Sequence, residues 1–176
     1  MKIDLTQLRR LPEKKIELNE TFDFTHIIEG YVQLERLSPV QFIGKVELLA
    51  GLFLLEGKLK GTMTLLCSRC LTEIEHPFSI PVRILFASRN NAPDAELPED
   101  EIEWLDVDTL EPRPFLEEEI KLAIPYTPLC KEACEGICPE CGKNRNEGAC
   151  GCNTEKIDPR WEKLTTLFAQ KQDKNE

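Results

Sequence analysis

Residues 57–86 read GKLKGTMTLLCSRCLTEIEHPFSIPVRILF, and this stretch decides the fold. Polar and apolar residues alternate through residues 57–65, which is typical of a β-strand with one face buried. The alternation resumes after the turn CSRC and continues to the end of the stretch. The pattern therefore predicts a β-hairpin whose two strands are joined at Cys67–Cys70. The predicted apolar face of the second strand consists of Ile74, His76, Phe78, Ile80, Val82, Ile84 and Phe86.

Further strand signals lie on either side of the hairpin turn. The apolar run 46–55 predicts a third strand, so we expect an antiparallel meander of at least three strands. Pro77 and Pro81 place the second hairpin strand at an edge or a bulge, because proline has no amide hydrogen to donate. His76 lies on the apolar face, and we interpret it as a packed core histidine in preference to a ligand or a base. Residues 1–40 allow only short strands.

Helical patterns appear only after the sheet region. Residues 87–108 are typical of a long loop with one short strand near 102–107, and apolar spacing predicts a helix over 114–124. A second helix is predicted to begin at Asp158, which can cap it. The sequence thus indicates an α+β protein with an antiparallel sheet meander and one or two packed helices.

The chain divides in two on composition. We expect a sheet domain over residues 1–124, with its acidic loop and following helix, and a cysteine-rich tail with a terminal helix over 125–176. The tail has few apolar residues to bury, so we expect a metal to hold it together.

Charge and hydropathy exclude several classes of function. The chain has 176 residues with a net charge of −10, and residues 91–120 hold twelve acids against one arginine. Such a balance disfavours a protein that coats nucleic acid by charge alone, and the acidic run is interpreted as a solvated loop. No apolar run reaches the roughly 20 residues of a membrane span, and the N-terminus is polar. We therefore expect a cytoplasmic protein with no membrane partner.

Eight cysteines are the strongest functional signal. In a reducing cytosol, paired thiols are more often metal ligands or redox groups than disulfides. The cysteines form four close pairs, namely Cys67 with Cys70, Cys130 with Cys134, Cys138 with Cys141, and Cys150 with Cys152.

The cysteine spacing predicts one or two structural Zn²⁺ sites. Four thiolates in a tetrahedron suit zinc, and a Cys-x-x-Cys turn supplies two of them. Four pairs combine into two four-cysteine sites in three ways. The short spacing favours a compact tail site of Cys138, Cys141, Cys150 and Cys152, which leaves Cys130 and Cys134 to join the hairpin pair. A dithiol redox site and an iron–sulfur cluster are the competing interpretations.

No motif indicates catalysis. The chain has two histidines and lacks a nucleophile elbow, a phosphate-binding glycine loop and a His-Glu-x-x-His motif. A zinc ion with four cysteine ligands also has no open position for a substrate. We therefore expect a protein that is not an enzyme.

Several segments together resemble the YceD family of large ribosomal RNA subunit accumulation proteins. The resemblance extends over roughly residues 40–170. It is carried by CSRCL at 67–71, LAIP at 122–125, PLC at 128–130, GICPECGKNRNEG at 136–148, CGC at 150–152, and IDPRW at 157–161 with Leu164.

The resemblance implies a bacterial cytoplasmic factor, with plastid relatives, for accumulation of 23S ribosomal RNA and assembly of the large ribosomal subunit. Some members lack the cysteine-rich tail, so the tail is a stabilising module on this interpretation. The expected partner is precursor 23S rRNA or a large-subunit ribosomal protein. The candidate RNA contacts are Arg69, Arg145, Arg9, Arg10, Lys14 and Lys15. The alternative hypothesis is a zinc- and thiol-based redox sensor or redox-regulated chaperone.

Overall fold

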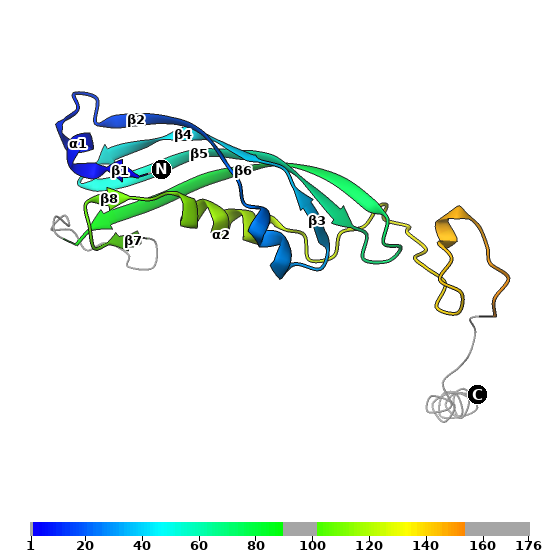
Figure 1. The fold of residues 1–176 in the computed structure, drawn as a ribbon. Helices are drawn as coiled ribbons and strands as arrows, with labels where there is room; N and C mark the ends of the chain where they lie inside the picture. The colour runs from blue at the N-terminus through cyan, green and yellow to red at the C-terminus, as the bar shows by residue number, and fades with distance from the viewer. Residues whose placement is uncertain (1, 90–101, 154–176) are drawn as a thin grey trace, which may run out of the picture. The chain divides into compact units, whose positions relative to one another are not determined.

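A six-stranded sheet forms most of the first of two compact units, which are residues 1–130 and 131–176. The computed structural model describes residues 2–89 and 102–153. Strand order in the sheet is β2-β4-β5-β6-β7, and β3 pairs with β5 beyond the first residue of β4 (Figure 1). The strands are β2 (Lys15–Phe22), β3 (Leu34–Leu37), β4 (Val40–Leu49), β5 (Leu52–Leu66), β6 (Glu73–Ser88) and β7 (Ile102–Leu105).

The central hairpin is the one that the sequence predicts. Strands β5 and β6 pair without interruption, from Phe53 opposite Phe86 to Leu66 opposite Glu73. The predicted edge position of Pro77 and Pro81 is also confirmed, because β7 pairs only with the last residues of β6, from Leu85 onward. Strand β7 runs parallel to β6, so the sheet is not wholly antiparallel.

Two strand-level expectations are wrong. The apolar run 46–55 is not one strand, because the chain turns at Ala50 and Gly51, both with positive φ, between β4 and β5. His76 is exposed and does not pack in the core. It lies opposite the buried Met63 near the turn end of β6, where β6 is the edge of the sheet, so the alternating pattern alone could not distinguish it from the buried Val82 and Phe86.

The N-terminal forty residues contain more structure than their pattern predicted. Strand β2 pairs with β4 along its whole length. A second, two-stranded sheet joins β1 (Ile3–Asp4) to β8 (Thr109–Leu110). Helix α1 (Leu5–Arg10) begins at Asp4, whose carboxylate accepts the amides of Thr6 and Gln7 at 2.9 and 3.3 Å.

The helix predicted over 114–124 is confirmed as α2 (Arg113–Ala123). Leu116 and Ile120 are buried, and Phe115 packs edge-on against Phe86 of β6 with ring centroids 4.8 Å apart. The described residues also form the 3-10 helices η1 (Thr25–Gly30) and η3 (Arg145–Glu147). The second predicted helix, from Asp158, lies outside the described residues. Within the described part of the chain, no helix has the length and apolarity to cross a membrane.

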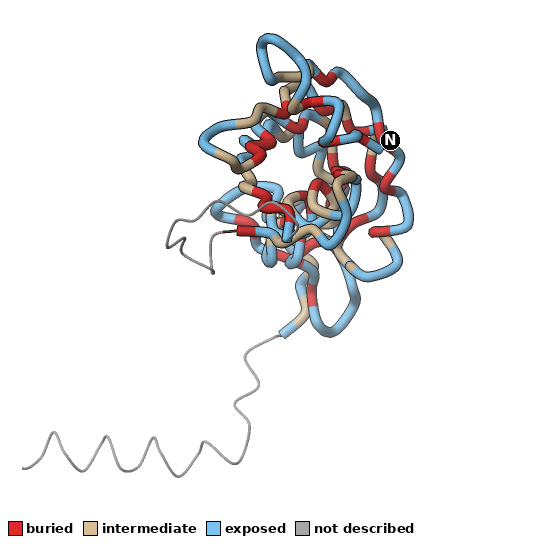
Figure 2. Tube along the Cα trace, turned by 90° about the vertical axis from the view of Figure 1, so that its left-hand side faces the viewer, coloured by how far each residue is buried: buried red, intermediate tan, exposed pale blue. Residues whose placement is uncertain are grey.

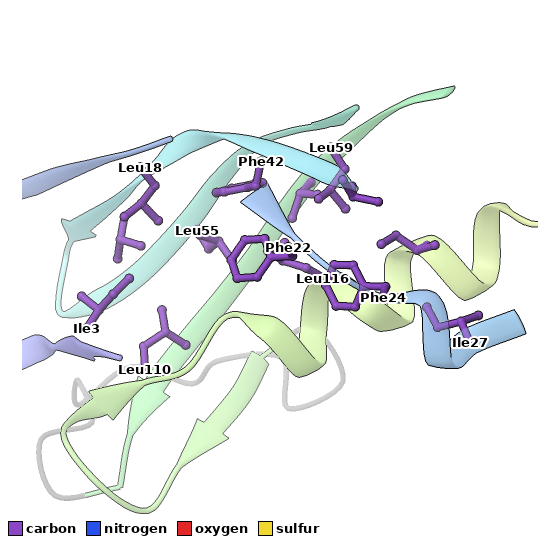
Figure 3. Close-up of a cluster of buried hydrophobic side chains, with 14 of the residues drawn as sticks. Ile3, Leu18, Phe22, Phe24, Ile27, Phe42, Leu55, Leu59, Leu110 and Leu116 are labelled. Carbon is purple, nitrogen blue, oxygen red and sulfur yellow. The ribbon is translucent and has the colours of Figure 1, made fainter. Parts of the chain in front are cut away.

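The hydrophobic core lies between one face of the sheet and α2, η1 and the N-terminal segment. Figure 3 shows Phe42, Leu55 and Leu59 of the sheet facing Leu116 of α2 and Phe24. Buried and exposed stretches alternate along the chain (Figure 2). Burial of these large side chains is the main source of stability for this unit.

A glycine pair lets two strands approach closely under an aromatic ring. Gly44 of β4 stands opposite Gly57 of β5, and the ring of Phe42 covers both. A Cβ at either position would lie 2.7 Å from the Phe42 ring and within 2.6 Å of a carbonyl oxygen on the other strand. The fully buried ring therefore requires glycine on both strands.

Candidate metal centres

Two groups of four cysteines have their sulfurs close together. Within each group all four sulfurs lie within 4.8 Å of one another. The first group is Cys67, Cys70, Cys130 and Cys134, and the second is Cys138, Cys141, Cys150 and Cys152. Of the three ways of combining the pairs, this is the one that the short spacing favours.

The hairpin turn positions the first two thiols of the first group. The amide of Cys67 donates to the Thr72 carbonyl at 2.9 Å, and the amide of Leu71 donates to the Cys67 carbonyl at 2.9 Å. Leu71 has a φ of 59°, so the turn tightens enough to bring Cys70 back toward Cys67. Both sulfur-bearing residues are buried although they lie in a turn.

A second segment brings Cys130 to the hairpin turn. The amide of Ser68 donates to the Pro128 carbonyl at 2.8 Å, which fixes the chain two residues before Cys130. The sulfurs of Cys70 and Cys130 are 3.5 Å apart. This separation is far longer than an S–S bond of about 2.05 Å, and none of the eight cysteines, all of which lie in the described residues, forms a disulfide.

The surroundings of Cys67 favour its thiolate. Burial opposes ionisation, but backbone amides of Arg69, Cys130 and Cys70 donate to the sulfur and lower the pKa of Cys67 to about 6. A thiolate is the form that binds a metal. The turn therefore supplies both the position and the charge state that a ligand needs.

The second group lies on a tight turn followed by a short loop. The amide of Cys138 donates to the Lys143 carbonyl at 2.9 Å, and Gly142, at a φ of 72°, donates to the Cys138 carbonyl at 2.8 Å. Ile137 and Asn144 form a single bridge across the base of the turn. Amides of Cys141 and Glu140 are the main cause that lowers the pKa of Cys138 to about 6.

Hydrogen bonding within the second group retains one proton. Contacts with Cys141 and Cys150, assisted by burial, raise the pKa of Cys152 to about 12. Cys138 thus ionises readily, while full ionisation of all four thiols is opposed by their mutual repulsion. A divalent cation at the centre would offset this repulsion and hold all four as thiolates.

Asn146 is a residue that the cysteine pattern did not identify. Its side-chain amide donates to the Cys134 sulfur at 3.3 Å and to the Asn144 side-chain oxygen at 2.8 Å, while its own oxygen accepts the Glu135 amide at 3.1 Å. Hydrogen bonds of this kind orient a ligand and tune its basicity. The two asparagines at Asn144 and Asn146, shortly before Gly148, were the available signal in the sequence. Asparagine is common in turns, where its side chain forms hydrogen bonds with nearby backbone groups.

Both groups fit a tetrahedral metal. A zinc ion with sulfurs at about 2.3 Å spaces them about 3.8 Å apart, which is within the 4.8 Å limit that each group meets. The chemistry of the donors, four thiols with no nitrogen or oxygen ligand, suits zinc or an iron–sulfur centre and not a hard cation. The structure therefore presents two four-cysteine groups positioned like metal sites.

The predicted cationic residues do not gather in one place. Lys14 lies beside the start of β5, where its carbonyl accepts the Leu48 amide, whereas Arg69 follows the end of β5. At about 3.3 Å per residue, the 15 residues of β5 separate the two by roughly 50 Å. Arg10, in the last turn of α1, and Arg145, in η3, are both exposed.

Two of these cations have structural neighbours. The guanidinium of Arg9 stacks on the buried Phe53 ring at 5.0 Å, and two of its nitrogens are buried without a hydrogen-bond partner in the described part of the chain. Lys15 pairs with Glu13 and Glu17 at 3.3 and 3.7 Å. Contact of these residues with RNA stays a prediction.

Comparison with known proteins relates the chain to ribosomal RNA accumulation. A family model described as Large ribosomal RNA subunit accumulation protein YceD matches residues 55–168. The chain is 28% identical over 171 residues to the uncharacterized protein YlbN of Bacillus subtilis, covering 97% of this chain and 98% of the relative. It is 26% identical over 174 residues to the uncharacterized protein Rv2926c of Mycobacterium tuberculosis, covering 98% and 84%.

A plant relative has a name that states a function. The chain is 28% identical over 146 residues to the chloroplastic Large ribosomal RNA subunit accumulation protein YCED homolog 1 of Arabidopsis thaliana, covering 68% of this chain and 46% of the relative. No solved structure matches the chain.

Proposed function

Because this chain belongs to the YceD family, we propose that it is a non-catalytic cytoplasmic factor for accumulation of 23S ribosomal RNA and biogenesis of the large ribosomal subunit. The match over residues 55–168 carries this proposal, since it includes most of the central hairpin, all of α2 and both cysteine groups. The factor would act by binding precursor 23S rRNA or a large-subunit ribosomal protein.

Structural zinc is part of the proposal. Each four-cysteine group would hold one Zn²⁺ ion with every coordination position filled by protein, which leaves none for a substrate. The described segment from Lys131 to Asn153 has short turns, the 3-10 helix η3 and no strand or α-helix, so the metal would hold it in place of a packed core. Binding of zinc would thereby stabilise the folded form of the tail.

Depletion in the host tests the function. We expect loss of the protein to lower the ratio of 23S to 16S rRNA and to shift the large-subunit peak on a sucrose gradient toward immature particles. Restoring the wild-type chain should restore both. An unchanged ratio and gradient after depletion would refute the accumulation role.

A redox sensor or redox-regulated chaperone is the second candidate. One observation favours it, namely that the sulfurs of Cys70 and exposed Cys130 are 3.5 Å apart. Hydrogen peroxide would oxidise these two thiols to a disulfide, and the peroxide would be reduced to two molecules of water. Loss of the two thiolate ligands would release zinc. Zinc and free thiols counted before and after mild peroxide distinguish the candidates, because rapid, reversible zinc loss with a change of activity supports the sensor and tightly held zinc refutes it.

A further inference from the structure

We propose that the end of α2 and the loop before β3 form a docking surface for a cationic amphipathic segment of a partner protein. The surface, here termed the α2 patch, has Val32, Leu122 and Tyr126 as its apolar centre. That this partner is a ribosomal protein rests on the proposed function; the chemical class of the docking segment does not.

The α2 patch holds the most exposed large apolar side chains in the described residues. Val32 is 94% exposed, Tyr126 is 92% and Leu122 is 83%, whereas no other large apolar residue there exceeds 62%. Single exposed apolar residues are ordinary, but three on adjoining segments point to an interaction site.

Two contacts bring the patch residues together. The side-chain amide of Gln33 donates to the Pro125 carbonyl at 3.4 Å, so the neighbours of Val32 and Tyr126 touch. Tyr31 lies close enough to Lys121, which directly precedes Leu122, that ionisation of its phenol would raise the pKa of the lysine. The loop before β3 therefore lies along the last turn of α2, and Figure 1 shows η1, β3 and the end of α2 side by side.

Acidic residues flank the apolar residues along both segments. Glu29 and Glu35 flank Val32 by three residues on either side, and Glu118 precedes Leu122 by one helical turn. All three are exposed, and none forms an ion pair with another described residue.

The basic residues close to the patch are already engaged. Lys121 pairs with Glu117 at 2.6 Å, and Arg36 pairs with Glu73 at 2.7 Å. Each of the two cations is thus already paired with another carboxylate, although Lys121 also attracts Glu118 and raises its own pKa in doing so. The α2 patch is an apolar surface with a negatively charged rim.

Charge complementarity selects the occupant. The rim repels phosphate groups, which disfavours RNA and anionic membranes as ligands of this surface. It also opposes pairing with the same surface of a second copy, since like charges would face each other. An amphipathic segment would complement both parts of the surface. Leucine-like residues on one face would contact the apolar centre, and lysine or arginine residues bordering that face would pair with the carboxylates of the rim.

Binding of a defined peptide tests the α2 patch. A fluorescein-labelled Leu/Lys peptide, LKKLLKLLKKLLKL, is titrated with the full chain in its metal-loaded form, and anisotropy gives the Kd at low and high salt. The triple variant Val32→Ser, Leu122→Ser, Tyr126→Ser should bind at least about tenfold more weakly. Glu29→Gln with Glu35→Gln and Glu118→Gln should weaken binding and reduce its dependence on salt.

A matched control changes three apolar residues elsewhere in the described surface, Leu11→Ser, Leu49→Ser and Val107→Ser, and should keep wild-type affinity. Equal loss in this control, no loss in the α2 patch variant, or no binding by the wild type would overturn the inference. The inference also fails if a labelled 23S rRNA fragment, and not the peptide, loses affinity in the patch variant, or if the variant alone turns a dimer into a monomer by light scattering.

Complementation separates this inference from the proposed function. Where depletion lowers 23S rRNA, the control triple variant should restore it and the α2 patch variant should not. If depletion leaves 23S rRNA unchanged, the proposed function fails, while the peptide titration still decides whether the α2 patch binds a cationic segment.

Discussion

At the residue scale, the structure gives specific roles to single residues that no sequence motif identifies. Gly57 is required by the close approach of β4 and the ring of Phe42, and Glu117 connects α2 to η1 through His26 at 3.0 Å and to Lys121 at 2.6 Å. Each of these residues acts on a neighbour that is distant in the sequence or on another element.

Gly57→Ala should destabilise the chain by about 1–3 kcal/mol, because the new Cβ would lie 2.6 Å from the Ile43 carbonyl oxygen and 2.7 Å from the Phe42 ring. The free energy of unfolding in urea measures this. Gly30→Ala is the matched control, since a Cβ there meets nothing within 4 Å. Equal stability of the two variants would show that the glycine pair tolerates a side chain.

Glu117→Gln should remove a contribution to the free energy of unfolding that is present at neutral pH and lost in acid. The hydrogen bond from Lys121 is the largest cause that holds the pKa of Glu117 below its ordinary 4.5, against burial and with help from His26. Because the folded pKa is the lower one, this stabilisation is present above pH 4.5 and is lost as pH falls through the folded value.

The measurement for this prediction is the free energy of unfolding of both chains at neutral pH and at a pH well below the ordinary glutamate pKa. The deficit of the variant should be largest at neutral pH and should shrink in acid. Glu118→Gln, which removes an exposed carboxylate one residue away, serves as control. A deficit that does not change with pH would contradict the ionic role of Glu117.

At the element scale, helix ends and cysteine turns depend on a few side-chain bonds. Asp4 caps α1, although that helix has only six residues, and the helix places Leu5 and Leu8 in the core. The turns at Cys67 and Cys138 similarly depend on backbone amides that face sulfur.

Asp4→Ala should lower the Tm by about 2–4 °C, because the amides of Thr6 and Gln7 lose their acceptor. Asp4→Asn keeps an oxygen at the cap and should stay near the wild type. Thermal unfolding followed by circular dichroism compares the three chains. Loss of stability in Asp4→Asn equal to that in Asp4→Ala would assign the effect to charge instead of capping.

Cys138→Ser should remove one of two bound zinc ions and unfold the second cysteine group while leaving the sheet intact. The sheet core of residues such as Phe42, Leu59 and Phe86 contains no residue of this group, which explains the independence. Zinc per chain by elemental analysis and protease sensitivity of the tail are the readouts. Full zinc content with an unchanged melting curve would contradict the prediction, and Ser68→Ala provides a control with all cysteines present.

At the scale of the whole molecule, two different sources of stability operate. The sheet unit buries a large apolar core, whereas the segment from Lys131 to Asn153 buries mainly Cys134, Gly136 and Cys138. The first unit should therefore fold without metal, and the second should depend on it.

Removal of metal tests this division. A strong chelator should release about two zinc ions per chain and make all eight cysteines reactive toward a thiol reagent, while the β-sheet signal in circular dichroism persists. Re-addition of zinc should reverse both changes. Collapse of the sheet signal together with metal release would show that the two units depend on one metal-stabilised fold.

The sequence by itself determined the features that depend on local pattern. Alternation specified the β5–β6 hairpin, the prolines specified its edge, apolar spacing specified α2, and cysteine spacing favoured the grouping now seen. These features follow from periods of two or 3.6 residues and from short loops, which a linear pattern contains. The family resemblance came from the same ordered segments.

Only the tertiary structure decided the rest. Whether a position on the apolar face of β6 is covered depends on what packs above it, so Phe86 is buried while His76 is exposed. The pairing of β7, the stacking of Arg9 on Phe53 and the exposure of the α2 patch likewise depend on which distant segments meet. Long-range packing has no period along the chain, and that is the physical reason why the pattern could not supply it.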